Sequence, residues 1–581
     1  DCMFIFQKMA DKNSMEKSLR EYTRWAGQTL PQDLKKELKE IEKDPNAIYD
    51  RFCRDLTFGT SGLRGKMGVG PNMINSIVLK RATDGVIDYL RSKHLNPQVI
   101  ISYDTRINSM EYAEGVAEEL ASNGISVKIF AEPTPVPVLS FAIRELKADC
   151  GIMITASHNP KEYNGYKVYD HCGNQIDDRK ARAVEDYINK REYFENGTAS
   201  AKAEIPAEIK ILDDKVKNAY FKALRENILF WDEETKARKA LSDLEVVYTP
   251  LNGTGRDYVM EVAKSLGIRK IKMVEEQSFW DGNFPTCPSP NPEYDQVFLL
   301  AKEKYCDENT DIIVATDPDS DRMGVMARDN SEEGKGLFKR LTGNQTGLLM
   351  LDYICYCHSK GKGGRFLDEN KTVYKSYVSS PLAEDIARSY GITIKNVPTG
   401  FKNIAAEIEK LKNQGRENDF LFGFEESQGY LYGNYTRDKD GALAVQMICL
   451  LAACLKEQGK TLFDQIEDIQ KRYGYTKSLV TSVDFNSEMD RKNIDVLMEK
   501  LFDGKLQNLM GQEISHDFEH KENNMYRGIL PEGHQVIIRP SGTEMKVKIY
   551  IYARGKTSQE AEEKTRLLAD EIKAFINCEQ L

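Results

Sequence analysis

Residues 150 to 160 read Cys-Gly-Ile-Met-Ile-Thr-Ala-Ser-His-Asn-Pro, an apolar run of strand length that leads into a short polar segment. The apolar run, Gly151 to Ile154, predicts a buried strand, and the proline predicts a loop or turn after it. A hydroxyl on such a loop, beside an imidazole, is placed to carry a covalent group, so Ser157 is the candidate nucleophile and His158 its neighbour. Ser-His-Asn-Pro is also an ordinary connection between a strand and a helix. The decision between chemistry and a plain turn therefore depends on the other loops of the chain.

The segments around this strand alternate between strand-like and helix-like patterns. Short apolar runs at 99–102 and 127–130 alternate with helical patterns at 109–124 and 138–146, and the same alternation recurs at 244–267. This order predicts an α/β fold, in which helices cover both faces of mostly parallel sheets. Ligands bind such sheets beyond the carboxyl ends of the strands. Polar loops that directly follow apolar strands are therefore the candidate functional sites.

A second polar loop, residues 317 to 322, reads Asp-Pro-Asp-Ser-Asp-Arg and directly follows an apolar run. Alternating carboxylates can converge on one hard cation, and oxygen ligands favour magnesium over zinc. A calcium-binding EF-hand loop begins similarly, but its sixth residue is glycine and its twelfth is glutamate. Here those positions hold Arg322 and Arg328, which excludes the calcium loop. The pattern predicts a magnesium site, with solvated surface carboxylates as the alternative.

Two further loops also follow apolar runs. In Gly-Phe-Glu-Glu-Ser at 423–427, Glu425 and Ser427 have the acceptors and donors that vicinal sugar hydroxyls require, although Glu-Glu-Ser also starts many helices. The segment Arg-Pro-Ser-Gly-Thr-Glu at 539–544 combines a guanidinium, two hydroxyls and a glycine, a set that suits a phosphate dianion. Ordinary turn chemistry accounts for Pro-Ser-Gly but not for the flanking Arg539.

Together the four loops resemble those of the alpha-D-phosphohexomutase family, in the same order and at comparable intervals, from about residue 50 to near the C-terminus. The resemblance implies that Ser157 carries a transferable phosphoryl group, that the aspartate loop binds Mg²⁺, and that the last two loops hold the sugar and its phosphate. The implied metal ligands are Ser157, Asp317, Asp319 and Asp321.

The resemblance also implies an architecture of three related α/β domains plus a C-terminal α+β domain around a central cleft. The expected domains are 1–220 with the phosphoserine loop, 221–342 with the metal loop, 343–474 with the sugar-binding loop and 475–581 with the phosphate-binding loop.

Shorter motifs extend the resemblance. Thr60-Ser-Gly-Leu-Arg64-Gly is similar to an early family loop whose arginine faces the phosphoserine, and Asn164-Gly-Tyr-Lys167 is similar to the loop that carries an active-site lysine. Thr399-Gly-Phe-Lys402 and Arg437-Asp-Lys439 are similar to further ligand-contacting segments. The implied catalytic residues are Ser157, His158, Lys167 and Arg64. The implied substrate-binding residues are Thr60, Arg64, Arg322, Thr399, Gly400, Lys402, Glu425, Ser427, Lys439, Arg539, Ser541, Gly542 and Thr543.

Within the family, the segments at 341–345 and 423–427 look most like the branch that includes bacterial alpha-phosphoglucomutases and the eukaryotic phosphoglucomutase 2 and phosphopentomutase enzymes. The Gly-Glu-x-Ser-Gly pattern of mannomutases is missing. The expected reaction is the interconversion of glucose 1-phosphate and glucose 6-phosphate, through a phosphoserine enzyme and bound glucose 1,6-bisphosphate as primer and intermediate. Phosphopentomutase, glucose 1,6-bisphosphate synthase and phosphomannomutase are the alternatives. The one-carbon difference between a hexose and a pentose is decided by cleft geometry, which the sequence does not give.

The motifs leave three questions of chemistry open. The general base for the sugar hydroxyl is His158, Lys167 or Lys439. A metal-dependent phosphatase would hydrolyse the phosphoserine instead of passing the phosphoryl group on. A non-catalytic sugar-phosphate sensor would be expected to lack Ser157 or the aspartate triplet, and this chain has both.

Composition limits the partners and the compartment. A formal net charge of −10 argues against a nucleic-acid partner. No run approaches the roughly 18 apolar residues of a membrane span, which predicts no membrane partner. The N-terminal stretch shows no charged leader followed by an apolar core of signal-peptide length. The 11 cysteines lack Cys-x-x-Cys spacing, so a reduced, cytoplasmic protein is expected. Basic residues gather in or beside the motif loops, as a small anionic sugar phosphate requires: Arg64, Lys66, Lys167, Arg322, Lys402, Arg437, Lys439, Arg539 and Lys546.

Overall fold

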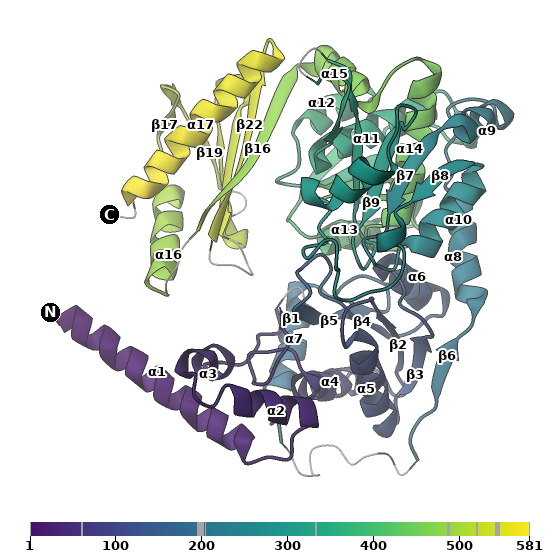
Figure 1. Cartoon of the computed structure of the whole chain (residues 1–581). Coiled ribbons are helices and arrows are strands. Elements are labelled where there is room, and N and C mark those ends of the chain that lie inside the picture. Colours follow the sequence, from purple (N-terminus) through teal and green to yellow (C-terminus); the bar gives the residue numbers. More distant parts are fainter. Residues whose placement is uncertain are drawn as a thin grey trace.

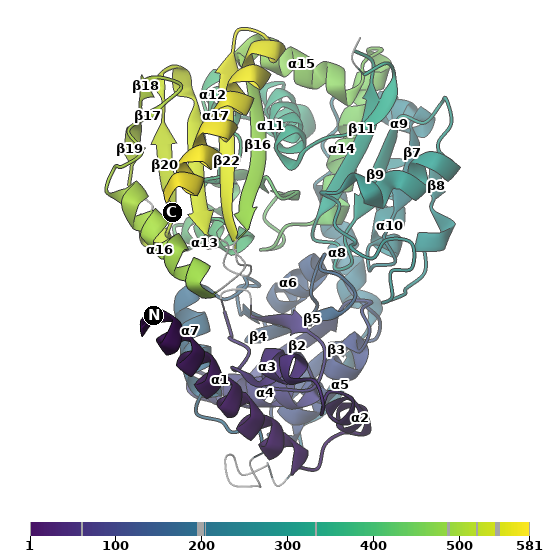
Figure 2. The ribbon, with the colours of Figure 1, turned by 60° about the vertical axis from the view of Figure 1, so that its left-hand side comes forward.

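The computed structural model describes residues 2–59, 62–194, 203, 205–331, 334–484, 488–518, 521–540 and 546–579. Four large sheets follow one another along this part of the chain, and we call them and their helices domains I to IV. Figure 1 shows domain I in purple and blue below domains II and III, with the yellow domain IV beside domain III. The rotated view in Figure 2 shows the same arrangement.

Domain I contains a six-stranded sheet in the order β1-β5-β4-β2-β3-β6. Four of its strands run parallel, and β5 is antiparallel to both of its neighbours. The strands are β1 (Leu63–Lys66), β2 (Gln98–Tyr103), β3 (Ser126–Phe130), β4 (Cys150–Ile154), β5 (Tyr163–Asp170) and β6 (Ile209–Leu212). The helices are α1 (Cys2–Ala26), α2 (Gln32–Glu40), α3 (Pro45–Phe52), α4 (Ser76–Arg91), α5 (Ser109–Ser122), α6 (Val136–Glu145) and α7 (Asp178–Ile188).

Domains II and III repeat the central part of the first sheet. The orders β10-β9-β7-β8 and β15-β14-β12-β13 match β5-β4-β2-β3, each with three parallel strands and one antiparallel strand. The expectation of three related α/β domains is confirmed. Their strands are β7 (Glu245–Thr249), β8 (Lys270–Met273), β9 (Ile312–Thr316), β10 (Met323–Asp329), β11 (Leu337–Arg340), β12 (Thr372–Ser376), β13 (Thr393–Val397), β14 (Phe420–Glu425) and β15 (Gly429–Tyr432).

The helices of domains II and III join these sheets into one body. One hydrophobic core runs from domain I through domain II into domain III, including Phe141, Tyr248 and Phe424. The helices are α8 (Asp214–Glu226), α9 (Glu234–Asp243), α10 (Arg256–Leu266), α11 (Gly343–Ser359), α12 (Leu382–Ser389), α13 (Phe401–Asn413), α14 (Gly441–Glu457) and α15 (Leu462–Tyr473). Since α14 packs against elements of both sheets and is buried along almost its whole length, it fixes the two domains relative to each other.

Domain IV is an antiparallel sheet in the order β16-β22-β21-β20-β19 with its own apolar core. It meets domain III through a small apolar cluster that includes Val378 and Tyr552 and through the ion pair between Arg554 and Asp385. Its elements are β16 (Tyr475–Asp484), α16 (Glu488–Phe502), β17 (Asn508–Leu509), β18 (Gln512–Glu513), β19 (Ser515–Asp517), β20 (Tyr526–Ile529), β21 (Gln535–Pro540), β22 (Lys546–Gly555) and α17 (Ser558–Glu579).

The expected domain bounds can be placed on these elements. The bound at 220 falls inside α8, whereas those at 342 and 474 fall between elements. Of the helices in the described ranges, none is by itself long and apolar enough to cross a membrane, and one bent pair, α14 with α15, passes by length and composition alone.

The motif loops leave equivalent strands of the three repeats. The serine loop follows β4, the aspartate loop follows β9 and the Glu-Glu-Ser segment begins at the end of β14. These three strands occupy the same place in their sheets. The repeat therefore gives each domain one loop in the same relative position, at the carboxyl end of a parallel strand.

Candidate active site

Ser157 lies on the loop after β4 and is 3% exposed. Its φ of 52° is left-handed, a conformation that costs a residue with a side chain about 1–2 kcal/mol. The hydroxyl donates to Asp317 Oδ2 at 3.0 Å and lies 3.2 Å from His158 Nδ1. The backbone N–H donates to Thr155 Oγ1 at 2.8 Å. The strained backbone thus aims the hydroxyl of domain I at the aspartate loop of domain II.

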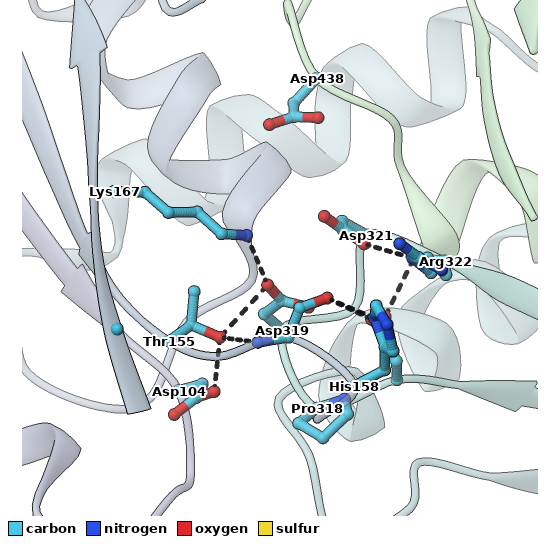
Figure 3. A network of polar contacts seen from close by, with 12 residues as sticks. Asp104, Thr155, His158, Lys167, Pro318, Asp319, Asp321, Arg322 and Asp438 are labelled. Carbon is cyan, nitrogen blue, oxygen red and sulfur yellow. Dashed lines mark hydrogen bonds and ion pairs between the residues drawn. The ribbon is translucent and has the colours of Figure 1, made fainter. Parts of the chain in front are cut away.

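The aspartate triplet is compact and buried. One carboxylate oxygen from each of Asp317, Asp319 and Asp321 lies within 4.8 Å of the other two. Lys167 Nζ donates to Asp319 Oδ2 at 3.1 Å (Figure 3), and Lys439 Nζ donates to Asp321 Oδ2 at 2.6 Å. Lys167 of β5 and Lys439, from the segment between β15 and α14, therefore offset part of the charge of the three carboxylates.

The donor set fits Mg²⁺. Among the described residues, Asp319 Oδ1 and Asp321 Oδ1 are buried without a hydrogen-bond partner. Burial, and then the charges of Asp319 and Asp321, raise the pKa of Asp317 well above its ordinary value. Such crowding of ionised carboxylates is relieved by a cation, and oxygen-only ligands suit magnesium. The three aspartates would hold it.

Electrostatics separates the candidate bases. Burial, and then the positive charges of Arg322 and Arg64, hold the pKa of His158 well below its ordinary range, so its imidazole is neutral at physiological pH. Burial lowers the pKa of Lys439, but Asp321 and other carboxylates more than offset this and keep its ammonium protonated. The structure therefore presents a neutral imidazole beside the serine and a charged lysine beside the triplet.

Glu425 of the predicted sugar loop and Arg539, which precedes the predicted phosphate loop residues, both contact the Thr-Gly segment of domain III. Gly400 N donates to Glu425 Oε1 at 2.7 Å, and Arg539 donates from domain IV to Thr399 Oγ1. Burial raises the pKa of Glu425, against the lowering effect of Lys439. Ser427 beside it is partly exposed. The Thr-Gly segment at 399–400 is thus the point where three predicted loops come together.

The other predicted site residues have these places. Arg64 donates to Asn159 Oδ1 of the serine loop at 3.2 Å, and Arg322 pairs with Glu293 at 2.7 Å. Lys402 pairs with Asp178 of α7, which ties domain III to domain I. Four predicted residues lie outside the described residues, namely Thr60, Ser541, Gly542 and Thr543.

Arg437 does not face the site, and its prediction as part of a ligand-binding segment is wrong. Its side chain is fully buried and pairs with Glu409 and Glu417. Arg144 of domain I pairs with the same two glutamates, at 3.2 Å each. The four charges form a structural link between domains I and III. The position of a basic residue beside a motif loop does not show whether it forms structural ion pairs or binds a ligand.

Asp104 and Arg106 were missed by the sequence interpretation. Asp104 Oδ2 accepts from Thr155 Oγ1 at 2.6 Å (Figure 3), and Arg106 donates to backbone carbonyls of the serine loop. Both residues directly follow the apolar strand predicted at 99–102, as the other site loops follow theirs. The same positional signal would have found them.

A buried serine hydroxyl joined to a carboxylate triplet, with cations around it, defines a phosphoryl-transfer enzyme. The chain matches the family descriptions "Phosphoglucomutase/phosphomannomutase, alpha/beta/alpha domain I" at residues 55–195, "domain II" at 218–332 and "domain III" at 342–473. It is 35% identical over 529 residues to a phosphoglucomutase of Staphylococcus haemolyticus, a match that covers 86% of this chain and 90% of the relative. The chain belongs to the phosphoglucomutase/phosphomannomutase family.

Solved structures agree with this fold. A phosphoglucomutase/phosphomannomutase family protein from Burkholderia thailandensis superposes with a TM-score of 0.64 at 17% identity, covering 89% of this chain and 97% of the other. The open form of parafusin, a phosphoglucomutase from Paramecium, superposes with a TM-score of 0.66 at 19% identity, covering 90% and 94%. At these identities the likeness concerns the fold.

Proposed function

We propose that this chain is a phosphoglucomutase that interconverts glucose 1-phosphate and glucose 6-phosphate. The observation that carries the proposal is the 3.0 Å hydrogen bond from Ser157 Oγ to Asp317, because it places a nucleophile at a site suited to a divalent cation. Two relatives that are 35% and 34% identical to this chain are phosphoglucomutases, and each match covers about nine-tenths of the relative's length. The relatives favour glucose phosphates over the pentose and mannose alternatives, and the hydrogen bond favours an enzyme over a sensor.

The proposed reaction has two phosphoryl transfers. Phosphorylated Ser157 gives its phosphoryl group to a hydroxyl of the bound sugar monophosphate, so that the serine P–O bond breaks and a sugar P–O bond forms. The bound glucose 1,6-bisphosphate then turns over and returns its other phosphoryl group to Ser157. Lys167, Arg64 and Arg322 stabilise the charge of the transferring group. The three aspartates would hold Mg²⁺, which would further neutralise that charge.

The sugar hydroxyl must lose its proton during the first transfer. We assign this role to His158, since its Nδ1 lies 3.2 Å from Ser157 Oγ, where the hydroxyl would approach. The ammonium groups of Lys439 and Lys167 are instead engaged by the triplet, through ion pairs with Asp321 and Asp319. Glu425 and Ser427 would bind sugar hydroxyls, and Arg539 with its loop the phosphate that does not react.

A substrate comparison tests the proposal. Glucose 1-phosphate, mannose 1-phosphate and ribose 1-phosphate are supplied in turn, with a trace of the matching bisphosphate, and with Mg²⁺ present or chelated. We expect the highest kcat/KM for glucose 1-phosphate and no turnover after chelation. Faster turnover of ribose 1-phosphate would identify a pentomutase, and release of inorganic phosphate without glucose 6-phosphate would identify a phosphatase.

A further inference from the structure

Arg106 binds the serine loop through both terminal nitrogens of its guanidinium. Nη2 donates to the carbonyls of Ser157 and Asn159, both at 2.5 Å, and Nη1 donates to those of Pro160 and Tyr163, at 2.9 and 3.1 Å. The four terminal N–H groups thus match four carbonyls in one stretch of seven residues. The side chain is 3% exposed, so water does not compete for these bonds.

Asp104 orients Arg106 and the same loop from the other side. Its carboxylate accepts from the Arg106 backbone N–H at 3.0 Å and lies 3.2 Å from Arg106 Nε. It also accepts from Thr155 Oγ1, which in turn accepts from the Ser157 N–H. Both residues follow β2, and Tyr103 at its end is paired with Ile154 at the end of β4. The neighbouring strand therefore carries both groups to the loop.

The chemistry of the loop explains why an arginine is needed there. Ser157 has a left-handed backbone, which side chains disfavour, and within the loop itself a turn bond from Asn159 N–H to the Ala156 carbonyl supports it, at 3.1 Å. The planar fork of a guanidinium can bind several carbonyls at fixed angles, whereas an ammonium acts as a single point. Phe284 of domain II packs over the guanidinium, 5.2 Å from its carbon, and closes the other face.

From this geometry we infer that Arg106 is the positioning residue of the active site: it holds the Ser157 loop in the conformation that points the hydroxyl at Asp317. This inference rests on the proposed function for its kinetic consequence. Arg106 touches no reacting atom in this arrangement, because both of its terminal nitrogens donate to backbone carbonyls of the serine loop and its Nε lies against Asp104, 3.2 Å from Oδ2. Its loss should lower the rate of phosphoryl transfer and leave sugar-phosphate binding by domains III and IV intact.

The test compares Arg106 with a matched arginine. Arg328 also donates to three carbonyls, of Thr310, Gly336 and Asp307, and also lies over a ring, that of Phe338. These contacts lie near the start of β9, whereas the aspartate loop follows its end. The variants are Arg106→Lys, Arg106→Met, Arg328→Lys and Arg328→Met, each measured for kcat and KM well below its melting temperature.

We expect Arg106→Met to lower kcat about 100-fold with KM for glucose 1-phosphate changed less than about threefold. Arg106→Lys should retain more activity than Arg106→Met, and both Arg328 variants should keep the wild-type kcat. Wild-type kcat in the folded Arg106→Met variant would overturn the inference. If neither Arg106 variant folds, Asp104→Asn replaces them, and an unchanged kcat there has the same meaning.

A measurement that does not depend on catalysis tests the role of Arg106 separately from the proposed function. Amide hydrogen exchange over residues 155–163 should become at least about tenfold faster in Arg106→Met and stay unchanged in Arg328→Met. If the wild-type chain does not convert glucose 1-phosphate, the proposed function fails, and the exchange rates still decide the role of Arg106. Equal exchange in the loop of wild type and Arg106→Met would refute it.

Discussion

Ser157 Oγ lies 3.0 Å from Asp317 Oδ2, although 160 positions separate the two residues in the chain. The serine belongs to domain I and the aspartate to domain II, so the contact crosses a domain boundary. A continuous apolar core joins these domains, which gives the contact a rigid support. The catalytic geometry is therefore a property of the interface between two repeats.

Replacement of Ser157 by alanine should abolish turnover. Because the hydroxyl is the group that would carry the phosphoryl, we expect kcat to fall by at least about 10³-fold. The melting temperature should stay close to that of the wild type or fall slightly, since alanine removes one hydrogen bond. A coupled assay measures kcat, thermal unfolding measures the melting temperature, and phosphopeptide mass spectrometry locates the phosphoryl label.

A serine on the surface supplies the control for this experiment. Ser242 at the end of α9 donates only to the Lys239 carbonyl, and Ser242→Ala should keep full activity. Near-normal mutase activity in Ser157→Ala, or a phosphoryl label at another residue, would rule out covalent catalysis at this position.

Replacement of Asp319 by asparagine should weaken Mg²⁺ binding. The change removes one charge from the triplet and the ion-pair partner of Lys167. We expect a tenfold or larger rise in the Mg²⁺ dissociation constant and a loss of kcat of about 10²–10³-fold. Calorimetric titration with Mg²⁺ and the dependence of kcat on Mg²⁺ measure these changes.

Asp329 is the matched carboxylate for that variant. It is buried in the same domain and pairs with Lys339 at 2.8 Å, outside the triplet. Asp329→Asn should change stability but not the Mg²⁺ dependence. Equal Mg²⁺ affinity of the wild type and Asp319→Asn would exclude Asp319 as a ligand.

Replacement of Arg539 by alanine should weaken substrate binding without preventing phosphorylation of Ser157. Arg539 donates to Thr399 across the contact between domains III and IV, so its loss removes a phosphate donor and a link to the sugar loop. We expect KM for glucose 1-phosphate to rise about tenfold or more, since a charge-assisted hydrogen bond is worth about 1.5–3 kcal/mol. Phosphorylation of Ser157 by glucose 1,6-bisphosphate at saturation should persist.

The exposed Arg566 on α17 gives the control for Arg539. Arg566→Ala removes the same charge from the same domain and should leave KM unchanged. An unchanged KM in Arg539→Ala would remove the phosphate loop from the site.

The sequence predicted the parts of this site that depend on local pattern. Apolar runs followed by polar loops located Ser157, the aspartate triplet and Glu425, because the carboxyl ends of parallel strands carry ligand-binding loops. The contact of Ser157 with Asp317 follows from the resemblance of the whole set of loops to one family. Strand periodicity alone does not determine which loops of different domains meet.

The sequence alone did not distinguish charged side chains that line the active site from charged side chains that form structural ion pairs. Arg437 and Lys439 stand two positions apart in one motif, yet Arg437 is buried against Glu409 while Lys439 pairs with Asp321. Arg106 resembles any polar residue after a strand until its four carbonyl partners are seen. In each case the partner comes from a distant segment, and the role of a charge depends on its partner.

Replacement of Glu426 by glutamine should stabilise the protein at alkaline pH. Burial, and then the charge of Glu425, raise the pKa of Glu426 to about 7. Since this value lies above the ordinary pKa of about 4.3, the ionised side chain destabilises the folded state, fully above pH 7 and less as the pH falls toward 4.3. Ser376 Oγ and Ser379 Oγ donate to Glu426 Oε2 at 2.8 and 3.3 Å, and a glutamine oxygen can accept both bonds.

We therefore expect Glu426→Gln to raise the free energy of unfolding by about 1–3 kcal/mol at pH 8, and by less than half of that at pH 5. Thermal unfolding of wild type and variant at the two pH values measures the difference. Glu308→Gln, at an exposed position of domain II, should show no such pH-dependent gain. If Glu426→Gln gave the same gain at both pH values, or a loss at pH 8, the Glu426 carboxyl would titrate near its ordinary value, and the crowding of Glu425 and Glu426 would have no energetic cost.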